Sequence, residues 1–311
     1  MSRILVTGGA GFIGSHVIET LLKLDHTVML IDDLSSGNIN NLPPRHPLPD
    51  LYPNLHLRLW DILDLRLMDV IFHNFEPEAV IHLAAQPSIQ ESWKKADYDA
   101  KVNILGTINL LGLCQKYKVK RFVFASTSAV YSPSPSGIYD ESCPVRPQTP
   151  YGTSKMAAER YIMISGISYA ILRLGNVYGP RQVPLGENQL IPRYLAHVFQ
   201  GTDFVVNGDG EQRRDFIYVK DVANAFLKAV ESDARGIFNI GSCSAFSVKG
   251  ILGMIASMID KAKLNWKHGP AKKDELRKVL LGNRKATQTL GWKPEIDIIK
   301  GLRETIDAWP K

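Results

Sequence analysis

The sequence predicts an α/β fold: a doubly wound parallel β-sheet with a smaller mixed α/β lobe in the C-terminal part. Through residues 1–175, short apolar runs rich in β-branched residues alternate with amphipathic stretches of helical period. A glycine-rich turn follows the first apolar run, and a Tyr-x-x-x-Lys pair opens a later helix. Alternating strands and helices favour parallel strands joined by right-handed crossovers. We therefore expect a ligand site beyond the carboxyl ends of the strands.

Six segments have the apolar composition of strands that are buried on both faces of a parallel sheet. They are Ile4–Thr7, Thr27–Ile31, Leu55–Leu59, Ala79–Leu83, Arg121–Ala125 and Tyr169–Leu174. The helices between them are expected to begin near Phe12, Leu65, Lys101 and Pro150. Beyond these the pattern loosens, and the elements expected there are strands over Asp215–Val219 and Ile237–Ile240 and helices over Gln189–Gln200 and Val222–Val230. Those two strands either rejoin the main sheet or lie beside it.

The composition is that of a globular protein, with 311 residues of which 45% are apolar and 22% charged. No apolar run approaches the ~18 residues that a membrane-spanning helix needs. The net charge is +6, but no run of five basic residues and no basic-aromatic stripe indicates nucleic-acid binding. The three cysteines form no C-x-x-C pair, which favours a reducing compartment. Because strand-like sequence begins at Arg3, we expect no signal peptide and a cytoplasmic protein.

The turn after the first predicted strand carries Gly8, Gly11 and Gly14 in the spacing Gly-x-x-Gly-x-x-Gly. Gly8 permits a tight turn, Gly11 lets a pyrophosphate approach the backbone, and Gly14 lets the helix pack on the strand. The N-terminus of the following helix attracts phosphate. The turn therefore predicts the dinucleotide site of a Rossmann-type domain.

Acidic residues after the second and third strands bear on the choice of dinucleotide. Asp32 is placed to accept hydrogen bonds from the adenosine ribose and to repel a 2′-phosphate, so NAD is favoured over NADP. The alternative is an ordinary loop aspartate at the end of a strand. Asp61 is a candidate for the adenine amino group or, alternatively, a helix N-cap.

Tyr151 and Lys155 lie one helical turn apart, on the same face of the predicted helix. A phenol beside a fixed positive charge ionises more easily. Such a phenol suits a general base that works on an alcohol losing hydride to a nicotinamide. Together with the glycine turn, the pair predicts oxidation of an alcohol by NAD.

These segments resemble the extended short-chain dehydrogenase/reductase superfamily, in particular its nucleotide-sugar epimerases and dehydratases, and most of all its UDP-hexose 4-epimerases. The resemblance covers nearly the whole chain and rests on Thr7–His16, Asp32–Gly37, His82–Gln86, Ser126–Tyr131, the Tyr151 and Lys155 pair, Arg173–Pro180 and Gly208–Phe216. It implies that NAD is bound by Gly8, Gly11, Phe12, Ile13, Asp32, Ser36, Gly37, Asp61, Ile62, Leu83, Ala84, Ala85, Tyr151 and Lys155.

The resemblance also implies the catalytic roles. Tyr151 takes the proton of the sugar hydroxyl, Thr127 donates or relays a hydrogen bond to the same oxygen, and Lys155 holds the nicotinamide ribose. Lys155 and the positive nicotinamide are expected to depress the pKa of Tyr151. The alternative for Thr127 is capping of the strand end, with Ser126 and Ser128 as further hydroxyl candidates.

Ala129 departs from the dehydratase and decarboxylase branches, which carry acidic residues just after the catalytic hydroxyl. Without a carboxylate there, the remaining chemistry is oxidation at C4, rotation of the keto-sugar and return of hydride to the other face. We expect an NAD-dependent 4-epimerase of UDP-glucose and UDP-galactose or their N-acetyl derivatives. The alternatives are another nucleotide-sugar enzyme (a UDP-glucuronate epimerase or decarboxylase, a dehydratase, a reductase) and a non-catalytic nucleotide-sensing or RNA-binding member.

The substrate contacts implied by the resemblance lie in the C-terminal part: Asn176, Gln189, Leu190, Arg214, Lys272, Glu275 and Val279. Arg214 is expected to pair bidentately with the diphosphate. The pattern is poorer over Lys272–Arg277, where the family presents an Arg and then a Gly-Asp. Val279 falls near the C2 substituent of the sugar and is small enough to admit an N-acetyl group.

No histidine spacing resembles a metal motif, so no metal is expected, and His16 and His82 are expected to be packed or capping residues. The resemblance implies a homodimer formed by helices near Lys101–Tyr117 and Pro150–Ser165, with apolar positions at Ile104, Leu111, Met156 and Ile162. The alternative is that these side chains face the protein's own sheet. We assign residues 1–175, with returns over about 215–242, to an NAD-binding domain and 176–311 mainly to a substrate lobe.

Overall fold

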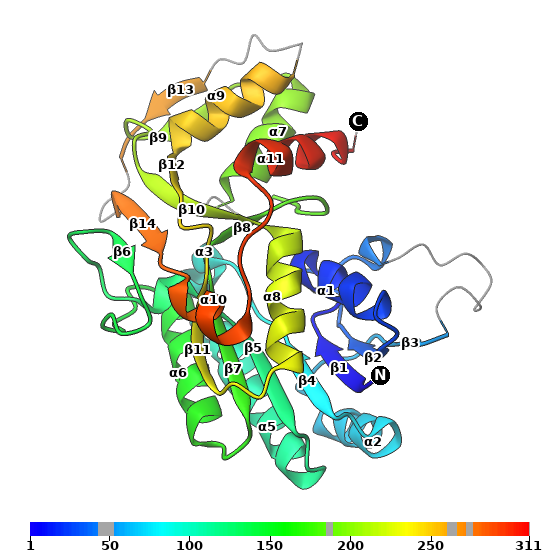
Figure 1. Ribbon diagram of the computed structural model, residues 1–311. Helices are drawn as coiled ribbons and strands as arrows, with labels where there is room; N and C mark the ends of the chain where they lie inside the picture. The colour runs from blue at the N-terminus through cyan, green and yellow to red at the C-terminus, as the bar shows by residue number, and fades with distance from the viewer. Residues whose placement is uncertain (43–52, 185–188, 260–265, 272–275, 311) are drawn as a thin grey trace.

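The computed structural model describes residues 1–42, 53–184, 189–259, 266–271 and 276–310 (Figure 1). Its main sheet has seven parallel strands in the order β11-β7-β5-β4-β1-β2-β3. These are β1 (Arg3–Thr7), β2 (Thr27–Ile31), β3 (Leu55–Arg58), β4 (Ala79–His82), β5 (Arg121–Thr127), β7 (Tyr169–Leu174) and β11 (Gly236–Ile240). The doubly wound parallel sheet expected from the sequence is confirmed.

Helices cover both faces of this sheet. One face packs against α1 (Phe12–Leu22), α8 (Val219–Glu231) and α10 (Arg284–Leu290). The other face packs against α2 (Leu65–Phe75), α5 (Gly106–Lys116) and α6 (Pro150–Ile164). Because the strand order reverses between β1 and β4, the chain leaves these two strands toward opposite faces, which opens a crevice at their carboxyl ends.

Elements of the C-terminal part gather at one end of the molecule (Figure 1). A second sheet has the order β12-β10-β14-β6, with β8 paired to β10, and a two-stranded sheet joins β13 and β9. The strands are β6 (Ile138–Tyr139), β8 (Asn176–Tyr178), β9 (Phe204–Asn207), β10 (Arg213–Tyr218), β12 (Ala245–Ser247), β13 (Trp266–Gly269) and β14 (Lys278–Leu281). The helices that pack there are α7 (Leu190–Gln200), α9 (Val248–Met258) and α11 (Ile298–Asp307).

The strands expected over Asp215–Val219 and Ile237–Ile240, whose sheet the sequence left open, lie in different sheets. β11 joins the main sheet beside β7, whereas β10 belongs to the second sheet. The helix expected to begin near Lys101 is interrupted: α3 (Ile89–Lys94) and α4 (Ala96–Ala100) come first, and a π-helical turn at Lys101–Leu105 leads into α5. The division into an NAD-binding domain and a substrate lobe stays a prediction.

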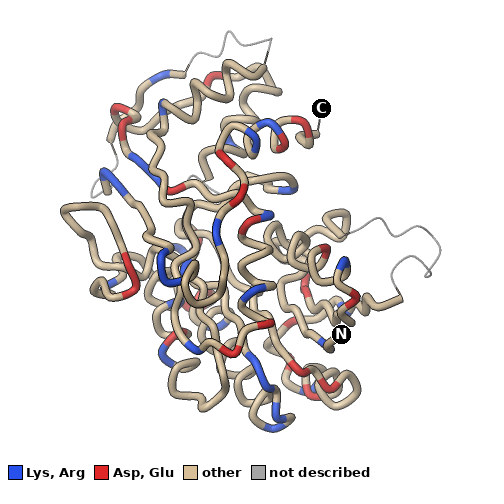
Figure 2. The backbone as a smooth tube through the Cα atoms, viewed as in Figure 1, with Lys and Arg blue, Asp and Glu red and all other residues tan. Residues whose placement is uncertain are grey.

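Charges of both signs are interspersed along the described chain and are not gathered into one basic stripe in the view of Figure 2. None of the described helices has the length and apolar character that crossing a membrane requires.

Candidate active site

A large cavity, with a volume of about 1580 Å³, lies at the carboxyl ends of the sheet strands and extends to the second sheet. Small-molecule pockets usually measure about 300–1,000 Å³, so this cavity has room for two ligands. It is lined by all the predicted site residues that the structure describes: Gly8, Gly11, Phe12, Ile13, Asp32, Ser36, Gly37, Asp61, Ile62, Leu83, Ala84, Ala85, Thr127, Tyr151, Lys155, Asn176, Gln189, Leu190, Arg214 and Val279. Lys272 and Glu275 lie outside the described residues.

The three glycines of the first turn serve different purposes. Gly8 has a φ of +71°, and a Cβ on it would lie 2.5 Å from the backbone nitrogen of Ala84. A Cβ on Gly14 would lie 2.1 Å from the carbonyl oxygen of Gly8. Gly11, at the start of α1, would place its Cβ no closer than 3.2 Å to that oxygen and otherwise faces open space. The turn thus leaves the N-terminus of α1 open to the cavity, as a pyrophosphate cradle requires.

Asp32 lies at the end of β2 with its carboxylate fixed on both sides. Its Oδ2 accepts a hydrogen bond from the Ala10 amide (2.9 Å) and its Oδ1 accepts one from the Leu34 amide (2.8 Å). Gly37 passes so close that a Cβ there would be 2.7 Å from Oδ1. Burial raises the pKa of this carboxyl group. Each carboxylate oxygen retains a second lone pair for a ribose hydroxyl, so the geometry fits the predicted role.

Asp61 lines the same end of the cavity beside Ile62. Its side chain accepts a hydrogen bond from the Leu63 amide (2.9 Å) and forms a local turn. The N-cap of α2 is Asp64, which accepts from two backbone amides of that helix. The N-cap alternative for Asp61 is therefore wrong, and its contact with adenine stays a prediction.

Tyr151 and Lys155 sit in the first turns of α6, which begins with Pro150 after a Thr149 cap. The Lys155 Nζ donates to the carbonyl oxygen of Ala125 at the end of β5 (3.0 Å) and lies 4.6 Å from the centre of the Phe124 ring. Lys155 is only 3% exposed. Burial lowers the pKa of Lys155 to about 8, and the charges of Asp99 and Glu159 act against this shift.

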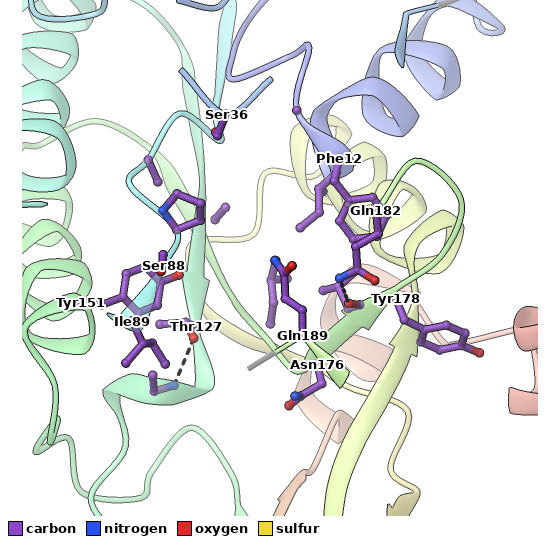
Figure 3. A pocket seen from close by; sticks show the side chains of 18 of the residues that line it. Phe12, Ser36, Ser88, Ile89, Thr127, Tyr151, Asn176, Tyr178, Gln182 and Gln189 are labelled. Atoms are coloured by element: carbon purple, nitrogen blue, oxygen red, sulfur yellow. Dashed lines mark hydrogen bonds between the residues drawn. The ribbon is translucent and has the colours of Figure 1, made fainter. Parts of the chain in front are cut away.

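The phenol of Tyr151 lies on the same side of the cavity as Thr127, and Asn176 and Gln189 lie across from them (Figure 3). Burial raises the pKa of Tyr151 to about 12, although a hydrogen bond with Thr127 lowers it. In the chain by itself, the cost of burying a phenolate is the larger effect, and Lys155 does not offset it. The depression of the Tyr151 pKa expected from the positive nicotinamide stays a prediction.

Thr127 combines the two roles that the sequence left open. Its Oγ1 accepts a hydrogen bond from the Ala129 amide (3.2 Å), which caps the 3₁₀ turn Ser128–Val130, and its side chain also meets the Tyr151 phenol. Ser126 is engaged elsewhere, since its hydroxyl donates to the buried carboxylate of Glu159 (2.5 Å). Thr127 is thus the better placed hydroxyl.

The charged residues that line the cavity are segregated. Among the described lining residues the carboxylates are Asp32, Asp33 and Asp61, all in the loops that follow β2 and β3. The cations are Lys155, Arg181, Arg193 and Arg214. No carboxylate among these lining residues comes from the Ser126–Ala129 segment or from α6, the elements that carry Thr127 and Tyr151. This basic, carboxylate-free part of the cavity suits an anionic substrate.

Arg214 and Val279 are neighbours in the second sheet, because β10 pairs with β14 in that register. The Nη1 of Arg214 donates to the carbonyl oxygens of Leu276 (2.8 Å) and Arg213 (2.9 Å). Val279 is 8% exposed and packs with Tyr131 and other apolar residues of a small cluster. Both side chains line the cavity, as predicted.

Several lining residues were not predicted from the sequence. Arg181 and Gln182 reach the cavity from the loop after β8, where Arg181 has a φ of +69° and pairs with Glu19 of α1. They directly follow the Tyr178-Gly179-Pro180 stretch, so the continuation of that motif was the available signal. Trp93 also lines the cavity, and nothing in the sequence pattern singles it out.

His16 and His82 are packed, as expected. His82 contacts the hydroxyls of Thr7 (2.7 Å) and Thr107 (3.0 Å), and burial lowers its pKa to about 3. His16 contacts the carbonyl oxygen of Pro180 (3.1 Å). Within the described ranges, no group of His, Cys, Asp and Glu side chains is arranged to hold a metal ion.

A dinucleotide cradle that faces a half-buried tyrosine, a half-buried threonine and a buried lysine fits the class of enzymes that move hydride to and from an alcohol. The NAD dependent epimerase/dehydratase family matches residues 4–241, and the chain belongs to this family. Its cofactor is NAD, as the glycine turn and Asp32 predicted.

Individual relatives match over almost the whole chain. The UDP-glucose 4-epimerase of Mycolicibacterium smegmatis is 33% identical, over 98% of this chain and 97% of the relative. The UDP-glucose 4-epimerase of Thermotoga maritima, solved with UDP-glucose, is 36% identical with a TM-score of 0.90 and 98% of each chain covered. The enzyme of the same name from Thermus thermophilus, solved with NAD, is 35% identical with the same TM-score and coverage.

Proposed function

We propose that the protein is an NAD-dependent 4-epimerase of nucleotide-diphospho-sugars, with UDP-glucose and UDP-galactose or their N-acetyl derivatives as substrates. The observation that carries this proposal is the part of the cavity lined by Thr127 and Tyr151. It offers the phenol of Tyr151, and none of the described residues that line this part is a carboxylate. Elimination or decarboxylation needs further acid and base groups at the neighbouring carbons. Inversion at C4 needs one group that takes a proton and returns it.

The proposed mechanism uses three side chains. The glycine turn and Asp32 would hold NAD, which would supply a hydride acceptor and donor for C4 of the sugar and a positive ring that would lower the proton affinity of a nearby phenol. Tyr151 takes the proton of the C4 hydroxyl as the hydride leaves. Thr127 donates a hydrogen bond to the same oxygen, and the Lys155 ammonium stabilises the phenolate. The 4-keto sugar then rotates and presents its other face. As the hydride returns to C4 on that face, Tyr151 gives the proton back to the oxygen.

The size and charge of the cavity support an anionic substrate beside the cofactor. The cofactor and the nucleotide sugar would share the volume of about 1580 Å³, and we propose that the hexose rotates there while its diphosphate stays in place. Arg214 is the proposed clamp of the diphosphate, and Asn176 and Gln189 are proposed to contact the rest of the nucleotide. The family resemblance supports all three roles, and Asn176 and Gln189 lie across the cavity from Tyr151 (Figure 3).

The proposal is tested by incubating the purified protein with UDP-glucose, UDP-galactose, UDP-N-acetylglucosamine and UDP-glucuronate and resolving the products by NMR. We expect the C4 epimer of at least one hexose substrate and no 4-keto-6-deoxy sugar or pentose. A dehydrated or decarboxylated product would show that the chemistry differs from simple inversion.

Replacement of Val279 by tyrosine is expected to change sugar selectivity. Val279 borders the cavity next to Arg214, and a larger side chain there takes up space that an N-acetyl group needs. We expect Val279→Tyr to reduce kcat/KM for UDP-N-acetylglucosamine about tenfold or more relative to UDP-glucose, because a steric clash discriminates by size. The smaller step Val279→Leu is the matched control and should shift the ratio less. An equal loss on both substrates would show that Val279 does not border the C2 substituent.

We also propose a homodimer that pairs the α5 and α6 surfaces of two copies. Leu111 and Ile162, which the sequence pattern offered for this contact, are instead buried in the protein's own core. The exposed apolar residues of this region are Leu105, Tyr161 and Ile164, the last being 78% exposed. Light scattering at micromolar concentration should give twice 34.7 kDa, and Leu105→Glu with Ile164→Glu should give the monomer mass. A monomeric wild-type protein would remove the dimer from the proposal.

A further inference from the structure

Asp99 of α4 is a buried carboxylate that lies behind α6, the helix that carries Tyr151 and Lys155, and does not line the large cavity. It is 1% exposed. Its Oδ1 accepts hydrogen bonds from the Gln86 Nε2 (2.9 Å) and from the Asn103 Nδ2 (3.1 Å). Asn103 also donates to the Ser154 Oγ (3.0 Å), and Ser154 donates to the carbonyl oxygen of Tyr151 (3.0 Å). Asp99 is thus joined to the helix turn that bears Tyr151 and Lys155.

The same network extends to the cofactor turn. Asn103 sits in the π-helical turn, a feature that often marks functional sites. Its carbonyl oxygen accepts from the Thr107 hydroxyl (2.8 Å), which contacts His82, and His82 contacts the Thr7 hydroxyl. The Ala84 amide donates to Thr7 (3.3 Å), where Ala84 borders the dinucleotide turn. A series of buried hydrogen bonds therefore connects the turn of α6 that bears Tyr151 with the dinucleotide turn. Asp99 lies at the end of this series next to α6.

The charge of Asp99 acts on both catalytic groups. It raises the pKa of Lys155 against the effect of burial, and it raises the pKa of Tyr151. Glu159 is the other carboxylate that acts on Lys155, but it is held by Arg173 in a buried ion pair (2.6 Å). His82 is a further titratable group near Lys155: burial and the Lys155 charge both lower the pKa of His82, so its ring is neutral. Burial raises the pKa of Asp99 itself, while Ser154, Gln86 and the Lys155 charge lower it.

We propose that Asp99 is a positioning residue for the catalytic pair: its buried carboxylate fixes the turn of α6 through Asn103 and Ser154 and balances the charge of the Lys155 ammonium. This role of Asp99 rests on the proposed role of Tyr151 as the base. An unbalanced buried cation is costly, and neutral Lys155 would no longer stabilise the phenolate. Asp99 thus keeps Lys155 charged without standing in the cavity, where a carboxylate would repel the substrate.

The test is Asp99→Asn, which keeps the shape of the side chain and removes its charge. Without that charge, the Lys155 ammonium loses a favourable partner and the Tyr151 phenolate loses a repulsive one, so both proton affinities fall. Because the two groups interact, the apparent pKa values belong to the pair. We expect the acid limb and the alkaline limb of the pH profile of kcat both to move to lower pH, by about one pH unit. Asp221→Asn is the control, because this buried carboxylate binds the amides of Glu295 and Ile296 and should leave both limbs in place.

A second readout does not depend on the reaction. Tyrosinate absorbance near pH 10 and above is recorded for the wild type and for Tyr151→Phe, and their difference reports the titration of Tyr151 alone. The same difference in the Asp99→Asn background should titrate about one unit lower. An unmoved difference curve overturns the proposal even if the protein is an epimerase, whereas a moved curve in a protein with no epimerase activity contradicts the proposed function alone.

If Asp99→Asn fails to fold, a double variant shows whether the unbalanced Lys155 charge is the cause. The double variant with Lys155→Met removes both members of the balanced pair, so it should fold again if Asp99 offsets the Lys155 charge. Failure of the double variant to fold would overturn the charge balance between Asp99 and Lys155, because the instability would then come from the lost hydrogen bonds of Asp99 and not from an unbalanced Lys155 charge. Asp99→Glu keeps the charge and should keep the wild-type pH profile in any fraction that folds.

Discussion

Tyr151→Phe is expected to lower kcat by about 10²- to 10⁴-fold, the usual contribution of a positioned acid or base. The phenylalanine ring keeps the packing at the start of α6, so the loss falls on proton transfer and not on folding. The measurement is steady-state turnover of UDP-glucose together with thermal unfolding. KM should change little, because the contacts proposed to hold the nucleotide come from the other side of the cavity.

The control for this variant is Tyr117→Phe. Tyr117 donates its hydroxyl to Asp69 between α5 and α2, away from the cavity. It should lose a small amount of stability and no activity. A folded Tyr151→Phe protein with near-normal turnover would remove Tyr151 from the mechanism.

Gly14→Ala and Gly11→Ala are expected to separate folding from cofactor binding. The Cβ of Gly14→Ala would lie 2.1 Å from the Gly8 carbonyl oxygen and 2.7 Å from the Gly9 Cα, so backbone must shift. We expect a loss of about 3 kcal/mol or more in the free energy of unfolding. Gly11 has an ordinary φ of −72° and open space beside it, so Gly11→Ala should change stability by no more than about 1 kcal/mol.

The two variants differ again when bound NAD is assayed. Gly11→Ala places a methyl group on the face that is open to the cavity, so the folded protein should lose co-purified NAD. Chromatography of the supernatant after denaturation, with an unfolding curve for each variant, measures both effects. Full NAD content in Gly11→Ala would show that the pyrophosphate does not approach the backbone there.

The main sheet and the cofactor end of the cavity follow from the sequence for simple reasons. Strands that are buried on both faces need continuous apolar residues, as in Ile4–Thr7 and Tyr169–Leu174, so their positions are visible in the composition. The dinucleotide turn needs glycine where a Cβ would strike backbone, at Gly8 and Gly14. Tyr151 and Lys155 are linked by helical spacing alone.

Other features depend on packing between distant segments. Asp99 lies in the stretch Lys94–Lys101, whose density of charges is typical of a solvated helix, yet the fold buries it behind α6. The pKa of Tyr151 depends on burial, which no local pattern reports. Strands of three or four residues, such as β8 and β9, are too short to carry a period, so the second sheet was only partly predicted.

In the proposed reaction, hydride leaves C4 of the sugar and returns to the same carbon on the other face. NMR of the reaction with UDP-glucose in D₂O follows the hydrogen at C4. We expect UDP-galactose that retains its original hydrogen at C4 and carries no deuterium at C3 or C5, because Tyr151 exchanges only the hydroxyl proton. Deuterium at C5 of the product, or accumulation of a 4-keto sugar lacking the C6 oxygen, would contradict it.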